Sequence, residues 1–416
     1  MTPIQKSAQP HEKRNFIVFV VNQIFVRIGW IFKTETVVMP GFLDTHTPSG
    51  VIRGFLPLIA RVGQSLPQFL IAHQVSKMPR KQAVFIGSAF GIMIPWLTLA
   101  LILGLTRFAG NVIVGFFLAS YTMHWLMLGC NMLANGTLQG KLIRPERRGR
   151  ILAYANTIGC MLAIAAFWLV VPYWLREGNT NYAWIFGTTG GFFGLAAYAG
   201  LYFREPPDST VQESSPLLKF LGSGLMLVRR DRDFRRLAVV ILLFYVVWLL
   251  FPHYTVFGMR RLGLAPGNFF TLIAVQNTIN ALSSGVMGNL ADRRGNRFVL
   301  RMLIFIGALA PLAAIFISRL AIGADLYWIV YAFLGFIPVS NRVVINYTLE
   351  IAPQQKHPQY LGVMSLFQAL PLCASPLLGL LIDRLSFEPV FVFCSLITLW
   401  AVFLTFRLSE PRFAHS

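Results

Sequence analysis

"GNLADRRGNRFVL", residues 288–300, is a short basic loop set between two long apolar runs. A loop of similar charge, "SKMPRK" at 76–81, follows the second apolar run, and "DRRGNR" at 292–297 follows the eighth. A further pair is "RPERRGR" at 144–150, after the fourth run, and "APQQKHP" at 352–358, after the tenth. Because matching loops recur in the same order, the sequence predicts two halves of the same hand.

The composition indicates that this chain is solvated by lipid. Hydrophobic residues make up 56% of the 416 residues, charged residues only 12%, and the mean hydropathy is +0.62. A water-soluble chain of this composition could not cover its surface with polar groups. The net charge of +20 is spread over short loops between apolar runs, which is typical of a membrane protein and argues against a nucleic-acid partner.

Twelve apolar runs are long enough to cross a bilayer, since a spanning helix needs about 20 residues. Most lysines and arginines fall in loops on one side, so we expect both termini to be cytoplasmic. The predicted organisation is a tail (1–15), a six-helix bundle (16–203), a cytoplasmic linker (204–236), a second bundle (237–407) and a tail (408–416). The predicted spans lie near 16–40, 51–73, 83–104, 111–134, 151–173, 183–203, 237–258, 269–290, 298–318, 325–348, 360–382 and 389–407.

The loop at 288–300 closely resembles the signature that the major facilitator superfamily carries between its eighth and ninth helices. The twelve runs, the basic central loop ending "RRDRDFRR" and the arginine-rich loop after the fourth run fit the same family. The resemblance implies an all-α membrane protein with two pseudo-symmetric six-helix bundles, a central cavity and transport by alternating access. It also implies a monomer. The residues that match the signature are Gly288, Leu290, Asp292, Arg293, Gly295 and Arg297.

The two signature copies differ in a way that suggests one charged cytoplasmic latch. The first copy has Ser76 in place of the acid and Pro79 in place of the glycine, whereas the second keeps Asp292. The expected partner of the second copy, the start of the fifth helix, keeps its arginines, and the helix dipole there favours a carboxylate. Closing this latch would favour the outward-open state. The predicted gating residues are Asp292, Arg293, Arg297, Arg148 and Arg150.

Charges inside the first run, "FVRIGWIFKTETVVMP" at 25–40, predict a solute site. A charge at the centre of a bilayer helix costs about 2.5–3.5 kcal/mol, and Arg27 lies about 16 Å from the inner end at the helical rise. On a helix, Gln23, Arg27, Trp30 and Thr34 share a stripe about 60° wide. Such a stripe does not belong against lipid, so we expect it to face an aqueous cavity and bind substrate.

The other charges near the outer end have a different interpretation. Lys33 is close enough to the interface to extend its amine outward. Arg61 is central in the second run and within reach of Glu35, so these two could form a structural pair.

Further polar residues lie on the helices that line the cavity in this family. Glu35 and His124 are candidates for proton coupling, although a packing role for His124 is equally compatible. Gln276 and Asn280 could instead form interhelical hydrogen bonds. With the stripe on the first run, the additional predicted substrate-binding residues are Arg61, Tyr121, His124, Gln276, Asn280 and Tyr331.

The sequence therefore predicts a secondary transporter in the plasma membrane that moves a small organic solute, with a weak preference for anionic or polar compounds. The expected partners are membrane lipid, the solute and optionally a proton. The chain lacks nucleophile-elbow, phosphate-loop and Cys/His metal patterns, so we expect no enzyme activity, no cofactor and no metal. Two alternatives are an efflux carrier for hydrophobic compounds, suggested by the 36 phenylalanines, and a receptor that kept the fold and lost transport.

Overall fold

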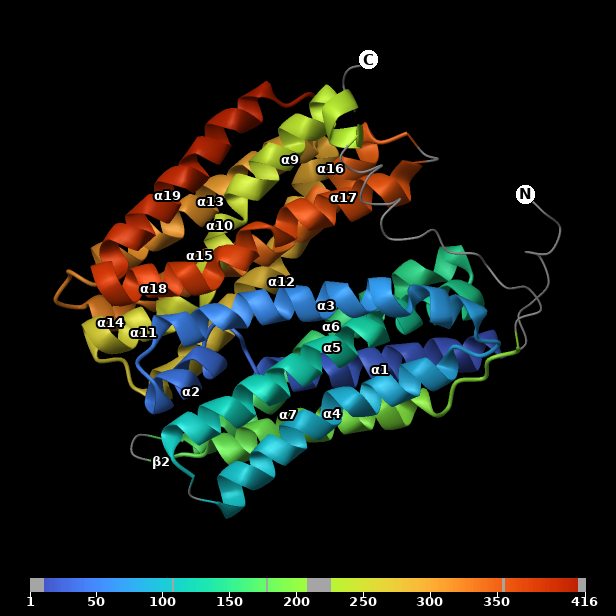
Figure 1. Cartoon of the computed structure of the whole chain (residues 1–416), viewed down its shortest axis with the longest axis horizontal. Coiled ribbons are helices and arrows are strands. Elements are labelled where there is room, and N and C mark those ends of the chain that lie inside the picture. The colour runs from blue at the N-terminus through green and yellow to red at the C-terminus, as the bar shows by residue number, and fades with distance from the viewer. Residues whose placement is uncertain (1–10, 107, 177–178, 208–225, 354–355, 411–416) are drawn as a thin grey trace. The chain divides into compact units, whose positions relative to one another are not determined.

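The computed structural model describes residues 11–106, 108–176, 179–207, 226–353 and 356–410, and these are almost entirely helical (Figure 1). Parts of the predicted linker and of both predicted tails lie outside the described residues. The chain divides into two compact units. The first comprises Met1–Thr34 and Ile59–Ser214, and the second comprises Glu35–Leu58 and Ser215–Ser416.

The first unit is a bundle of long helices. Helix α4 packs against α5 and α7, and α1 packs against α6 and α7. Small residues allow these close approaches: a Cβ atom added to Gly29 of α1 would lie 2.9 Å from the ring of Phe193 on α7. The elements are α1 (Glu12–Phe32), α3 (Gly50–Lys77) from Ile59 onward, α4 (Gln82–Leu105), α5 (Gly110–Leu142), α6 (Pro145–Trp174), the antiparallel strands β1 (Leu175–Arg176) and β2 (Asn179–Thr180), and α7 (Tyr182–Gly200).

Side chains close several helix ends in this unit. The Asn181 side chain accepts a hydrogen bond from the N–H of Trp184 and so caps the start of α7. At the start of α4, the buried carboxylate of Glu205 accepts the N–H of Gln82 at 2.7 Å and an ion pair from Lys141 at 2.8 Å. A carboxylate at a helix N-terminus is stabilised by the helix dipole, so Glu205 ties α4 to the end of α5.

The second unit contains shorter helices because proline interrupts several predicted spans. Pro252, Pro338 and Pro371 each stand in the first turn after a break, where their missing N–H is tolerated. Its helices are α2 (Val38–His46), the first turns of α3, α9 (Arg232–Phe244), α10 (Val246–Leu249), α11 (Phe251–Leu262), α12 (Phe269–Arg294), α13 (Asn296–Ile317), α14 (Gly323–Leu326), α15 (Trp328–Phe336), α16 (Ser340–Ile351), α17 (His357–Ala369), α18 (Ser375–Leu385) and α19 (Phe387–Leu404).

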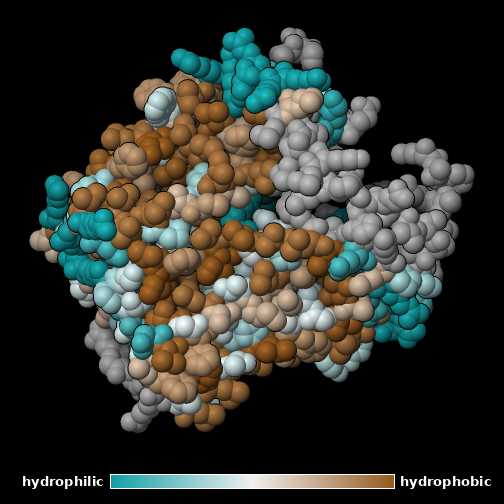
Figure 2. Space-filling model, viewed as in Figure 1, coloured by the Kyte–Doolittle hydropathy of each residue, from teal (hydrophilic) through white to brown (hydrophobic). Residues whose placement is uncertain are grey.

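Among the described residues, eight helical segments are long and apolar enough to cross a membrane. The predicted spans near 51–73, 151–173, 183–203 and 269–290 are helical too, so the all-helical fold class is confirmed while the count of twelve stays a prediction. Apolar side chains cover most of the face seen in Figure 2, and hydrophilic residues gather near the helix ends. Large apolar residues such as Leu105 and Phe403 are exposed, as expected for surfaces that face acyl chains.

Candidate functional site

The first predicted span, 16–40, is wrong in its outer third, because α1 ends at Phe32 and α2 begins only at Val38. Lys33 is the residue after the helix, and its N–H bonds the carbonyl of Trp30 at 3.3 Å. Thr34 therefore lies beyond the helix, so the four-residue stripe does not continue to it.

The predicted outward reach of Lys33 is also wrong, since its side chain is 0% exposed. Its ammonium nitrogen lies 3.6 Å from the centre of the Trp30 ring, 5.3 Å from that of Trp125 and 5.8 Å from that of Trp96. Indole faces carry negative charge density that attracts a cation, and the carbonyl end of α1 adds to this attraction. Together these interactions hold the charge in the interior.

His124 on α5 completes this aromatic cluster. Its Nδ1 accepts the indole N–H of Trp96 at 2.9 Å, which makes it the neutral tautomer with the proton on Nε2. Its ring centre lies 5.8 Å from that of Trp30 and 5.7 Å from that of Trp125. Tyr121 is fully buried one turn earlier and meets the edge of Trp125 at 6.2 Å. Of the predicted substrate residues, the structure thus brings Trp30, Tyr121 and His124 together.

Arg27 lies one turn before Trp30 on α1 and is half-buried. Its Nη1 is 3.7 Å from the sulfur of Cys160 on α6, and a Cβ atom added to Gly159 would lie 2.8 Å from its Cδ. The glycine thus makes room for the arginine stem against α6. Gln23, one turn earlier, is half-buried, and its amide is 3.5 Å from the side-chain oxygen of Asn22.

In the second unit, polar side chains converge on Thr36 in the break between α1 and α2. The Thr36 hydroxyl donates to Oε1 of Gln276 at 2.6 Å, and its carbonyl accepts the hydroxyl of Thr255 at 2.5 Å. Thr255 also bonds the hydroxyl of Tyr331 at 2.5 Å. Gln276 and Tyr331, predicted from the sequence to bind substrate, therefore hold this non-helical stretch in place. Asn280, also predicted to bind substrate, is half-buried one turn along α12.

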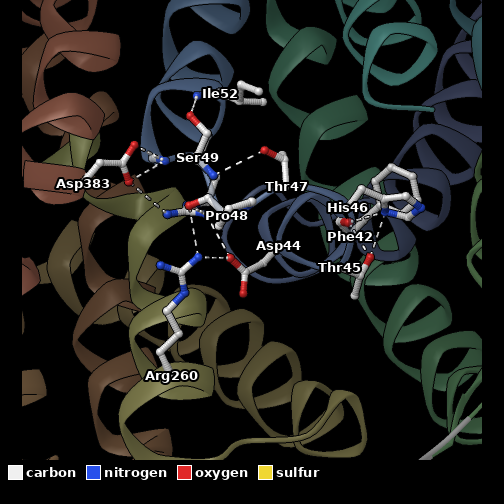
Figure 3. A network of polar contacts seen from close by, with 12 residues as sticks. Phe42, Asp44, Thr45, His46, Thr47, Pro48, Ser49, Ile52, Arg260 and Asp383 are labelled. Carbon is white, nitrogen blue, oxygen red and sulfur yellow. Dashed lines mark hydrogen bonds and ion pairs between the residues drawn. The ribbon is translucent and has the colours of Figure 1, made fainter. Parts of the chain in front are cut away.

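A group of charged residues, which we call the α2 clasp, fixes α2 and the first turn of α3 to α11 and α18 (Figure 3). Asp44 accepts Arg53 at 2.9 Å and Arg260 at 2.6 Å. Both oxygens of Asp383 accept the N–H of Gly50, at 2.8 and 2.7 Å, and Asp383 lies 4.0 Å from Arg53. The side chains of Arg53 and Asp44 are 0% and 11% exposed, so this ion pair is desolvated, whereas the side chains of Asp383 and Arg260 are partly exposed.

Glycines let α3 and α18 meet backbone to backbone beside this clasp. A Cβ atom added to Gly379 would overlap the carbonyl of Gly50, and one added to Gly54 would overlap the carbonyl of Ser375. Gly50 and Gly54 on α3, and Ser375 and Gly379 on α18, are each four residues apart. This is the small-xxx-small spacing that allows close helix packing in membranes.

The predicted gating residues lie at the ends of helices. Asp292, Arg293 and Arg150 are exposed. Arg297 donates to the carbonyl of Leu408 at 2.9 Å, while Arg148 donates to the carbonyls of Gly140 and Ile143 at the end of α5, at 2.7 and 3.0 Å. The latch between Asp292 and residues 147–150, like the pair of Arg61 and Glu35, would join residues of both units and stays a prediction.

Sequence reasoning missed Trp96, Trp125 and the buried role of Lys33. Trp125 is adjacent to His124, and Lys33 is three residues after Trp30, which is the spacing of neighbours on a helix. The contacts of Trp125 and Lys33 could therefore have been predicted from these two spacings. Trp96 looks like any aromatic residue of an apolar run, and only its hydrogen bond to His124 distinguishes it.

Long apolar helices in two units, with a lysine buried among indole rings, indicate a multi-pass membrane protein. The model of the Major Facilitator Superfamily matches residues 36–376, so the chain belongs to this family. It is a transporter and not an enzyme, as the sequence predicted. No curated protein matches the chain.

Solved structures of other transporters share the fold at low identity. A bacterial homolog of the human lysosomal transporter Spinster, inward-facing and unoccupied, has 15% identity and a TM-score of 0.66, with 98% of each chain covered. A D-xylose–proton symporter has 14% identity and a TM-score of 0.71, covering 95% of this chain and 98% of its own. The nucleoside transporter NupG has 11% identity and a TM-score of 0.74, covering 94% and 99%. At these identities the likeness shows the fold alone.

Proposed function

We propose that this protein is a secondary active transporter that moves a small anionic or polar organic solute by alternating access. The observation that carries the proposal is the balance of charge inside the first unit. Arg27 and Lys33 place two cations on or directly after α1, whereas α1, α4, α5, α6 and α7 contain acids only near helix starts, at Glu12 and Glu146. Cations are costly in a membrane and mark pathways for solutes and ions, so an anionic solute is the natural complement.

The aromatic cluster supports a solute with an organic body. Trp30 is half-buried between Arg27 and Lys33 along the chain, and an indole face can stack on a planar or apolar group. The same aromatic residues favour the second candidate, an efflux carrier for hydrophobic compounds. The two candidates differ in one property, since only the first requires a negative charge on the solute.

Proton coupling, the plasma membrane, cytoplasmic termini and a monomeric state are further parts of the proposal. The charge pattern of the loops supports the cytoplasmic termini, the family's usual architecture supports a monomer, and Glu35 and His124 are the candidates that support proton coupling. The helical part of the stripe, Gln23, Arg27 and Trp30, is proposed to face the solute, and Glu35 or His124 to exchange the proton.

Uptake into proteoliposomes tests this function. A library of organic anions, neutral polar compounds and hydrophobic cations would be screened with and without a pH gradient. We expect saturable uptake of an anion that falls at least about tenfold in Arg27→Gln, the loss of one charge-assisted interaction. The exposed Arg204 of the same unit supplies the matched control, Arg204→Gln, which should transport normally. Uptake restricted to hydrophobic cations would favour the efflux carrier, and no transport of any compound would favour a receptor.

A further inference from the structure

His253 on α11 is an unusual residue for the interior of a membrane protein. Its side chain is 0% exposed, and neither ring nitrogen has a hydrogen-bond partner among the described residues. A buried polar group without a partner costs about 1–3 kcal/mol. An apolar side chain of similar size would avoid this cost, so packing alone does not explain a histidine here.

The surroundings of His253 are charged, because α11 also carries Arg260 of the α2 clasp. Arg53 of α3 and Arg260, two turns further along α11, are the charges that act on its ring. Both arginines are engaged by Asp44, and Arg53 also approaches Asp383. With two carboxylates and two guanidiniums, the closed clasp is neutral only while His253 is neutral.

The other titratable groups around α11 do not compensate a charge on His253. His46 on α2 bonds its own helix, with Nδ1 2.9 Å from the carbonyl of Phe42, and Asp325 on α14 is exposed. Glu388 on α19 is already paired with Arg261 of α11, at 2.6 Å. Tyr254 and Tyr327, buried beside α11, are neutral hydroxyls, with Tyr327 donating to the carbonyl of Tyr254 at 2.7 Å. A proton on His253 would therefore add a third cation beside two arginines with no acid left to balance it.

We propose that His253 is a proton-binding site, and that its protonation opens the α2 clasp. This inference rests on the proposed transport function, to which it adds the place where a coupling proton acts. Opening exposes His253 to water and separates it from Arg53, so the open form binds the proton more tightly than the closed form. By linkage, acid then shifts the protein toward the open form.

The continuity of α3 links the opening of the α2 clasp to the first unit. Helix α3 is continuous from Gly50 to Lys77, so its first turns, held by the clasp, belong to the same helix that enters the first unit at Ile59. Residues 35–58 are thus held by the second unit while both their ends connect to the first. We expect a movement that pulls residues 35–58 away from α11 and α18 to break the ion pairs and hydrogen bonds of the clasp.

Distance measurements between spin labels test the proposal on the full chain in liposomes. Cysteines replace Thr45 of α2 and Arg384 of α18, which are both exposed, in a background without the four native cysteines. Between about pH 8 and about pH 5, where histidine titrates, a longer distance should gain population. The ratio of long to short distances should rise by up to about tenfold per pH unit.

Substitutions then test whether the pH dependence of the distance comes from His253. His253→Gln and His253→Phe should remove the pH dependence, whereas His357→Gln, on α17, should keep it. A distance that does not change with pH in the parent chain would overturn the proposal. A pH-dependent distance that persists in both His253 variants, or that is lost in His46→Gln, would overturn it as well. Solute uptake is measured in parallel without a pH gradient. If solute is taken up but the spin-label distance does not change with pH, the role of His253 is rejected and the transport function is not. If no solute is taken up but the distance changes with pH, only the transport function is rejected.

Discussion

The ammonium nitrogen of Lys33 lies 3.6 Å from the centre of the Trp30 indole ring, and the two residues stand three positions apart across the end of α1. Through this contact, the last turn of α1 binds the ammonium group of the residue that follows the helix. It explains how a charge remains 0% exposed in the interior of the first unit.

Replacing Trp30 by leucine should destabilise the protein. A desolvated cation–π contact contributes about 2 kcal/mol, and the contacts of Trp30 with His124 and Trp125 would be lost as well. We expect a clear drop in melting temperature in detergent. Trp400→Leu is the matched control, because Trp400 is 63% exposed on α19 and its removal should stay within about 0.5 kcal/mol. Equal effects of both changes would contradict this account of Lys33.

Lys33→Met should separate stability from function. Replacing a buried charge by an apolar residue of similar volume is often neutral or stabilising, so the melting temperature should hold or rise. If Lys33 attracts an anionic solute, uptake should nevertheless fall at least about tenfold, equivalent to about 1.4 kcal/mol of binding. The measurement is uptake by equal amounts of folded protein, with the amount checked by size-exclusion chromatography. Unchanged uptake would remove Lys33 from the solute pathway.

Much of the fold could be predicted because it depends on local composition. Apolar runs of about 20 residues form helices wherever lipid is the solvent, since only helices satisfy the backbone there. Helix ends were predicted less well. Within the run at 16–40, the polar residues 33–36 mark the place where α1 stops after Phe32, but the apolar residues 37–39 that follow favoured a single span drawn across the break. The hydrogen bonds that hold this break come from Gln276, Thr255 and Tyr331, more than 200 residues away in the sequence.

The candidate site was predictable in part for the same reason. Trp30 and His124 stood out as polar or aromatic residues at mid-membrane depth, and the structure brings them together. The α2 clasp was not foreseen, because Asp44, Arg260 and Asp383 lie near helix ends, where charges are ordinary. Only tertiary packing reveals that Arg53 is desolvated among them.

Asp44→Asn should be far more damaging than the loss of a surface ion pair. Removing the partner of a buried charge costs about 3–5 kcal/mol, and a neutral amide at position 44 would leave the buried Arg53 guanidinium with only the more distant carboxylate of Asp383, at 4.0 Å. The matched control is Glu388→Gln, which removes the pair with Arg261 at 2.6 Å, where the side chains are 27% and 47% exposed. Exposed pairs contribute about 0–1 kcal/mol. The measurement is the melting temperature of both variants. If Asp44→Asn lowers it no more than Glu388→Gln does, the clasp contributes little to stability.

Gly379→Ala should disrupt the crossing of α18 with α3, whereas Gly191→Ala should not harm α7. The added methyl group at Gly379 would overlap the backbone of Gly50, which cannot move without breaking its bonds to Asp383. Overpacking of this kind costs about 1–3 kcal/mol. At Gly191 no atom lies within 4 Å of the new methyl group, and alanine is favoured over glycine in a helix by about 0.5–1 kcal/mol. The two changes should therefore move the melting temperature in opposite directions. A stabilised Gly379→Ala variant would mean that α3 and α18 do not meet backbone to backbone, and the α2 clasp would then lose its structural basis.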